Sequence, residues 1–227
     1  VGPVHRPQER RLARSRKPHQ HQDLALTVRK HLDHPWQAPV SSHDRQAFHQ
    51  LQAWRDENGP GHPLMLDSGC GTGRSSVALA LSQPQALVVG VDQSEARLGR
   101  ALTRFSPLPA NLLLLRADCA GLWRLLAEQD IAVARHQILY PNPWPKSAHL
   151  KRRWHGHPVW PCLLAMGGVL EYRSNWRVYL EEVGSALAMT GVSSELQALP
   201  EQTSPLTDFE EKYQASGQPL WRLTATL

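Results

Sequence analysis

The sequence predicts an α/β fold: a mostly parallel, doubly wound sheet with helices on both faces and an antiparallel strand near the C-terminus. Three observations predict it. Short apolar runs alternate with helical patterns from residue 64 onward. Several of these runs are apolar throughout, as strands covered on both faces of a parallel sheet are. The first three runs end in or next to a carboxylate, at Asp67, Asp92 and Asp118.

The alternation of strands and helices continues along most of the chain, so helical crossovers are expected between parallel strands. Strands are predicted from short apolar runs and helices from apolar residues at helical spacing. The predicted strands are 64–67, 86–92, 111–118, 137–140 and 168–172, with closing strands at 194–199 and 220–227. The predicted helices are 74–81, 95–103, 122–129, 159–165 and 178–189.

The ordered part of the chain is expected to begin at Ser41 and to form a single domain over residues 41–227. The Ser41 hydroxyl can cap a helix whose third residue, Asp44, suits the positive end of the helix dipole. An apolar face supports this helix. Its members are Phe48, Leu51 and Trp54.

Residues 1–40 differ in composition and are predicted to form a basic, flexible arm that touches nucleic acid. Basic side chains outnumber acidic ones, and five prolines interrupt regular structure. The only helical pattern in this segment is Leu24, Val28 and Leu32. The basic side chains are Arg6, Arg10, Arg11, Arg14, Arg16, Lys17, Arg29 and Lys30.

The overall composition favours a polyanionic partner inside the cell. The chain has 227 residues and a formal net charge of +5, which is a modest argument for nucleic-acid binding. No apolar run is long enough to cross a bilayer, and the N-terminus is too polar for a signal peptide. We therefore expect a cytoplasmic protein without a membrane partner.

The cysteines and histidines indicate neither disulfides nor a metal. Cys70, Cys119 and Cys162 are far apart and odd in number, so a reducing compartment fits them. There are 12 histidines, but the pairs with close spacing lack a neighbouring cysteine or carboxylate in a ligand pattern. We expect no bound metal.

A glycine-rich turn follows the first predicted strand and predicts a cofactor site. Its glycines permit tight backbone geometry and close approach of a ligand, and Asp92 can accept hydrogen bonds from ribose hydroxyls. A dinucleotide is the competing cofactor, but its fingerprint is Gly-x-Gly-x-x-Gly, whereas here the glycines are evenly spaced. This spacing resembles the S-adenosylmethionine loop of class I methyltransferases. The predicted cofactor residues are Asp67, Gly69, Gly71, Gly73, Asp92, Asp118 and Cys119.

The tip of the fourth predicted strand indicates chemistry on a nucleic-acid base. Asn142 and Trp144 stand among three prolines, and a cationic run follows from Lys146. An amide and an indole can hold a planar base, while Lys146, Arg152 and Arg153 can contact the phosphate backbone.

From about residue 64 to its end, the chain resembles the bacterial tRNA (guanine-N7)-methyltransferase family. The resemblance implies a class I methyltransferase, Rossmann-like fold. The N-terminal arm shows no such match. Four segments carry the resemblance: 67–73, 141–153, 167–179 and 206–210.

The resemblance implies methyl transfer from S-adenosylmethionine to N7 of a guanine in tRNA by direct in-line attack. It places Asn142, Asn175, Thr207 and Glu210 in the guanine pocket, with Asn142 at the catalytic position. The family usually has aspartate where this chain has Asn142 and Asn175. An amide supplies a dipole in place of a charge, so altered specificity or a reduced rate is expected.

Two alternatives remain open at this stage. A catalytically weak or silent RNA-binding paralogue would explain the two missing carboxylates. An amino methyltransferase, acting on adenine, cytosine or glutamine, would explain an asparagine at the fourth strand's tip. That class has Asn-Pro-Pro-aromatic, whereas the order here is Asn142-Pro143-Trp144-Pro145.

Overall fold

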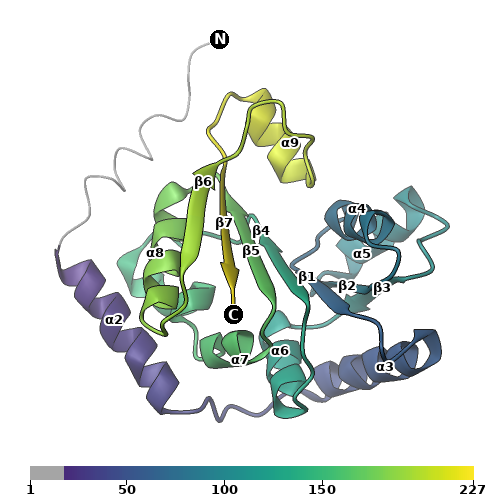
Figure 1. Ribbon diagram of the computed structural model, residues 1–227, viewed down its shortest axis with the longest axis horizontal. Coiled ribbons are helices and arrows are strands. Elements are labelled where there is room, and N and C mark those ends of the chain that lie inside the picture. Colours follow the sequence, from purple (N-terminus) through teal and green to yellow (C-terminus); the bar gives the residue numbers. More distant parts are fainter. Residues whose placement is uncertain (1–17) are drawn as a thin grey trace.

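The computed structural model describes residues 18–227 and shows the predicted α/β architecture (Figure 1). A seven-stranded sheet has the order β3-β2-β1-β4-β5-β7-β6. Strands β1 to β5 pair in parallel, and β7 runs antiparallel to both β5 and β6. The strands are β1 (Leu64–Ser68), β2 (Leu87–Asp92), β3 (Leu112–Arg116), β4 (Arg135–Leu139), β5 (Val169–Ser174), β6 (Ser194–Ala198) and β7 (Trp221–Thr226).

Helices cover both faces of this sheet. Figure 1 shows α4 and α5 together on one side of β1, β2 and β3, and α3 and α6 on the other. The helices are α2 (Pro18–Asp33), α3 (Ser42–Asn58), α4 (Arg74–Ser82), α5 (Glu95–Arg104), α6 (Cys119–Glu128), α7 (Trp160–Ala165), α8 (Arg177–Ala188) and α9 (Asp208–Ala215). Two short 3-10 helices, η1 (Ser147–Arg152) and η2 (Trp154–Gly156), lie between β4 and α7.

The main core lies between the sheet and the face formed by α3, α6, α7 and α8. Leu51, Leu66, Trp123 and Leu180 are all fully buried in one continuous apolar cluster. A smaller cluster around Leu79 fills the space beneath α4 on the opposite face. Within residues 18–227, no helix combines the length and apolarity that a membrane crossing requires.

Every predicted strand and helix is present, with ends within three residues of the predicted ones, but helix α9 was not predicted. Capping accounts for the largest shift. Strand β3 ends at Arg116, two residues before the predicted end, because Asp118 is already the N-cap of α6. Its carboxylate accepts a hydrogen bond from the Ala120 amide at 3.1 Å. Helix α6 therefore begins three residues earlier than the pattern of apolar side chains alone indicated. The 3-10 segments were not predicted.

The predicted start of α3 is confirmed. The Ser41 hydroxyl accepts a hydrogen bond from the Asp44 amide at 3.0 Å and donates to the Asp44 carboxylate at 2.7 Å. The other carboxylate oxygen of Asp44 accepts from the Asp118 amide at 2.9 Å. The cap of α3 thus also fixes the junction between β3 and α6.

The expected flexible arm is wrong for residues 18–33, which form helix α2 packed against α7 and α8. Leu24 and Val28 are 3% and 0% exposed and belong to the main core. The apolar spacing that we noted in this segment outweighs its basic composition because it gives the helix one face to bury. Residues 1–17 of the expected arm lie outside the described residues.

The docking of α2 is tested by two identical substitutions on one helix. Leu24→Ala should lower the free energy of unfolding by about 2–4 kcal/mol, because a buried leucine leaves a cavity. Leu26 is 66% exposed, so Leu26→Ala should change stability by less than about 0.5 kcal/mol. Urea unfolding of both variants measures the difference, and equal effects would show that α2 is not packed on the core.

Candidate active site

The predicted site residues gather at one edge of the sheet. Because β1 to β5 are parallel, the segments that follow their carboxyl ends meet there, and ligands of such sheets bind where the strand order reverses. Here that point lies between β1 and β4. Helix α9 lies beside the same edge (Figure 1).

The glycine turn after β1 is open to a ligand. Gly69 and Gly71 have φ of +79° and +58°, values that residues other than glycine rarely adopt. A Cβ at either position would meet nothing within 4 Å, so no side chain of the described residues covers the turn there. Gly73 differs, because a Cβ there would lie 2.9 Å from that of Ala101. Gly73 therefore allows the start of α4 to pack closely against Ala101 of α5. It is buried and is not exposed to a ligand.

Asp67 and Asp92 hold this turn in place. Asp67 is 1% exposed, and its Oδ2 accepts hydrogen bonds from the Ser75 and Ser76 hydroxyls at 2.6 Å. Burial raises the pKa of Asp67, and the two serines oppose that shift. Asp92 accepts from the Gly71 amide at 3.0 Å. Asp67 thus anchors the start of α4 beneath the turn, whereas Asp92 lies directly beside it.

Asp118 and Cys119 lie where β3 gives way to α6. Asp118 is half-buried and caps the helix. The pKa of the Cys119 thiol is raised to about 12, because burial outweighs hydrogen bonds to the Gly69 backbone and to Ser68. A thiol that stays protonated is no nucleophile, so Cys119 supports the turn as a small buried residue.

The loop after β4 has a constrained backbone. Tyr140 and Trp144 both have positive φ, at 53° and 43°, which is uncommon for non-glycine residues and often marks functional sites. Between them, Asn142 is exposed, and its side-chain oxygen lies 3.4 Å from the Trp144 amide. The amide group of Asn142 is therefore exposed to solvent at the sheet edge. This position is compatible with the predicted contact with guanine.

Trp144 contacts the side chains of Arg152 and His149. The Arg152 guanidinium lies 4.8 Å from the centre of its ring, and His149 packs edge-on at 5.5 Å. Lys146 and Arg152 are exposed beside it. The predicted phosphate-contacting role of Lys146 and Arg152 is compatible with these positions.

The predicted role of Arg153 in contacting tRNA is not supported. Arg153 is only 8% exposed. Its Nε and Nη2 donate to the Trp144 carbonyl at 3.2 and 3.0 Å, and its Nη1 pairs with Glu182. The positive charge is used to hold the loop after β4 against α8, because a buried guanidinium must be paired.

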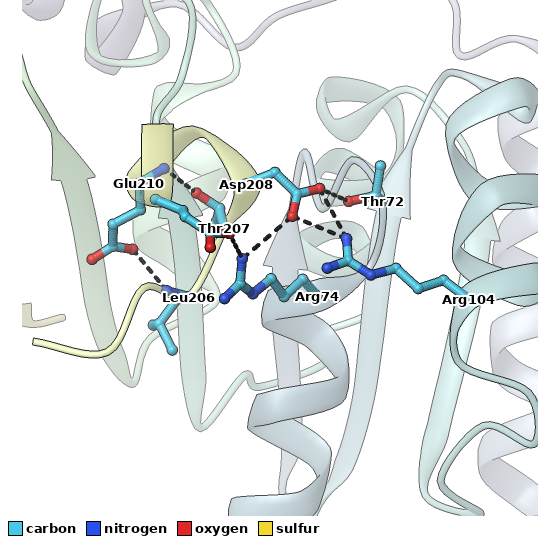
Figure 2. Close-up of polar contacts among 8 residues, drawn as sticks. Thr72, Arg74, Arg104, Leu206, Thr207, Asp208 and Glu210 are labelled. Carbon is cyan, nitrogen blue, oxygen red and sulfur yellow. Dashed lines mark hydrogen bonds and ion pairs between the residues drawn. The ribbon is translucent and has the colours of Figure 1, made fainter. Parts of the chain in front are cut away.

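Two residues predicted for the guanine pocket, Thr207 and Glu210, lie at the start of α9. Thr207 caps this helix by accepting from the Glu210 amide at 3.0 Å. Glu210 is fully buried. One carboxylate oxygen accepts from Arg173 at 2.8 Å. The other accepts from the Leu206 amide at 3.1 Å (Figure 2). Glu210 therefore fixes α9 against β5 and has no exposed surface for a base.

Asn175 follows β5 at the same edge and is half-buried. Its amide donates to the Gln218 side chain at 2.9 Å. The structure thus brings the loops of Asn142 and Asn175 and the start of α9 together through adjacent strands. Of the four side chains predicted for the guanine pocket, only that of Asn142 is exposed.

Arg173 and Asp208 are structural parts of this edge that sequence reasoning missed. Arg173 joins Glu171 at 2.8 Å to Glu210, and Arg135 pairs with Glu171. Two charged residues at alternate positions of an otherwise apolar strand could have signalled this network. Asp208 binds Thr72 at 2.7 Å; no local pattern connects residues so far apart in sequence.

Among residues 22–227, whose side chains the structure describes, no group of three or more histidines, cysteines or carboxylates is arranged to hold a metal ion.

Some known proteins resemble this chain in sequence, and others resemble it in fold. The model of a methyltransferase family matches residues 61–223. A tRNA (guanine-N(7)-)-methyltransferase from Lysinibacillus sphaericus is 29% identical over 75% of this chain and 82% of its own length. The protein of the same name from Yersinia enterocolitica is 31% identical over 71% of each chain.

Solved structures support the fold alone. The 16S rRNA methyltransferase KamB has a TM-score of 0.56 and 20% identity over 84% of this chain and 95% of its own. A variant of the 16S rRNA (adenine(1408)-N(1))-methyltransferase from Catenulisporales acidiphilia, solved with its cosubstrate SAM, has a TM-score of 0.51 and 18% identity over 77% and 90%. The family model and the sequence relatives together show that the chain belongs to the tRNA (guanine-N(7)-)-methyltransferase family.

Proposed function

We propose that this chain transfers a methyl group from S-adenosylmethionine to N7 of a guanine in tRNA. The observation that carries the proposal is the open glycine turn after β1, which lies at the same sheet edge as the exposed Asn142 loop. The relatives named tRNA (guanine-N(7)-)-methyltransferases support the choice of base and RNA.

The residues around the turn fit the adenosyl cofactor. Gly69 and Gly71 leave the backbone uncovered, so a ligand can approach it closely. Asp92 already accepts from two amides, those of Gly71 and Ser94, but a carboxylate has about four acceptor positions and can also meet ribose hydroxyls. Asp118 would meet the adenine amino group. When bound, S-adenosylmethionine supplies a methyl group on a cationic sulfur.

The acceptor side needs alignment more than proton transfer. Guanine N7 has an in-plane lone pair and no proton, so it requires no general base. Holding two reactants in the right geometry contributes several kcal/mol, roughly 7–11 kcal/mol at the limit. Asn142 can accept one hydrogen bond from the guanine edge and donate one to its O6. We assign Asn142 the role of orienting the base.

The charge at this site distinguishes the chain from the pattern of its family. A guanine that receives a methyl at N7 becomes cationic, and a nearby carboxylate would stabilise that charge. Asn142 and Asn175 are amides, and the carboxylate of Glu210 is paired with Arg173. We infer that this chain acts more slowly than a family member with both acids, or on a different guanine context.

The tRNA backbone would lie over Lys146 and Arg152, which are exposed beside the Asn142 loop. We place the reaction in the cytoplasm, where free cysteines such as Cys70 and Cys162 stay reduced.

A direct assay tests the proposed reaction. The purified chain, incubated with unmodified tRNA and labelled S-adenosylmethionine, should produce 7-methylguanosine because N7 is the aligned nucleophile. Nucleoside mass spectrometry of the digested tRNA identifies the product. Label found only in adenosine, cytidine or protein would exclude this activity and favour the amino methyltransferase alternative.

The glycine turn is tested by a pair of matched substitutions. Gly69 and Gly191 have nearly equal φ, +79° and +78°, and both have open space where a Cβ would lie. Gly69→Ala and Gly191→Ala should therefore lose similar stability, roughly 1 kcal/mol each. Only Gly69→Ala should weaken binding of S-adenosylhomocysteine, by at least tenfold in calorimetry. Equal affinities would show that the turn does not contact the cofactor.

Restoring the expected acid tests the charge argument. Asn142→Asp places a carboxylate where the methylated ring becomes positive, so kcat for tRNA methylation should rise several-fold. Single-turnover kinetics measure the effect, with Asn58→Asp as a charge-matched control on the far end of α3. A catalytically silent RNA-binding protein, the second candidate, would show no turnover before the substitution. A fall in kcat would contradict the assigned role of Asn142.

A further inference from the structure

The first turn of α9 makes a second set of contacts, on the opposite side from Glu210. Asp208 Oδ2 accepts a hydrogen bond from the Thr72 hydroxyl at 2.7 Å. Arg104 Nη1 lies 3.0 Å from Oδ1, and Arg74 Nη1 lies 3.4 Å from the same oxygen. Arg74 also pairs with Glu211. Figure 2 shows these side chains converging on one carboxylate, and we call them the Asp208 network.

The Asp208 network connects the two halves of the proposed site. Thr72 lies inside the glycine turn, between Gly71 and Gly73, and Arg74 is the first residue of α4. Asp208 stands between the cap residue Thr207 and Glu210 at the start of α9. Glu210 joins α9 to β5 through Arg173, and Asp208 joins it to the glycine turn through Thr72. The first turn of α9 therefore connects β5 with the glycine turn, which we also call the cofactor turn.

The ion pairs of the Asp208 network are partly exposed to solvent, so the contact can form and break. The Asp208 side chain is 44% exposed, and exposed ion pairs are weak individually because water screens them. Partial burial opposes ionisation, but hydrogen bonds from Thr72 and Arg104 outweigh it and lower the pKa of Asp208. The carboxylate is therefore charged at neutral pH and binds three donors at once.

We propose that Asp208 is a positioning residue that holds the acceptor segment, residues 206–210, against the cofactor turn. This inference rests on the proposed function, since it couples the two binding regions of that reaction. A ligand that orders the turn then also orders α9, and such coupling acts equally in both directions. Asp208 itself contacts neither the methyl group nor the base.

Hydrogen exchange measures this coupling without any methylation. In the unaltered chain, S-adenosylhomocysteine should slow exchange of the amides of α9, because occupancy of the turn stabilises the Asp208 network. In Asp208→Asn, these amides should exchange about fivefold faster without ligand, which corresponds to roughly 1 kcal/mol. The protection by S-adenosylhomocysteine should also be lost. Unchanged exchange, or equal protection in both proteins, would overturn the proposal.

A matched acid and a double-mutant cycle separate positioning from general charge effects. Glu201 is an exposed acid in the loop before α9 and forms no ion pair within the described residues, so Glu201→Gln should leave exchange and activity unchanged. Arg104→Gln should reproduce part of the effect of Asp208→Asn, because it removes one of the three donors to Asp208. The double variant should lose no more than Asp208→Asn alone, since the charged contact with Arg104 is already absent from that variant. Additive losses would overturn the proposal.

The kinetic readout distinguishes this inference from the proposed function. Asp208→Asn should lower kcat/KM for tRNA by about fivefold, while calorimetry still detects S-adenosylhomocysteine. If the unaltered chain bound the ligand but methylated no tRNA, the proposed function would fail and the exchange result would still decide the role of Asp208. If it methylated tRNA with α9 unresponsive to ligand, only the role of Asp208 would fail.

Discussion

The buried ion pair between Glu210 and Arg173 determines how this site is assembled. A fully buried carboxylate persists only when it is paired and hydrogen-bonded, and removing one partner of such a pair costs about 3–5 kcal/mol. Glu210 meets this condition through Arg173 and the Leu206 amide. The pair therefore places the start of α9 on β5 and leaves the carboxylate unable to face a substrate. One ion pair thus determines both where α9 lies and whether the Glu210 carboxylate can contact a substrate.

The same pair explains why the two asparagines matter. Were Glu210 free, it could supply a negative charge that the amides of Asn142 and Asn175 do not carry. Because it is neutralised by Arg173, the acceptor side depends on dipoles and on geometry. The loop after β4 has two positive-φ residues, Tyr140 and Trp144, and under the proposed function alignment of the base by this loop is the main contribution of the chain.

Sequence patterns predicted what depends on local chemistry. The alternation of strands and helices, the glycine turn after the first strand and the cap at Ser41 follow from residue spacing and turn geometry. The errors concern long-range packing. Basic composition hid the buried face of α2, and Arg153 was taken as exposed because a run of charges does not reveal which member points inward. Asp208 could not be found, since its partners lie more than 100 residues away.

The inward orientation of Arg153 has a consequence for RNA binding. Cations that neutralise phosphates release counterions, and the steepness with which affinity falls with added salt reports how many do so. Arg153 is committed to Glu182 and the Trp144 carbonyl, so it releases none. The affinity of this surface for tRNA is therefore expected to fall with added salt less steeply than the number of basic side chains in the sequence implies.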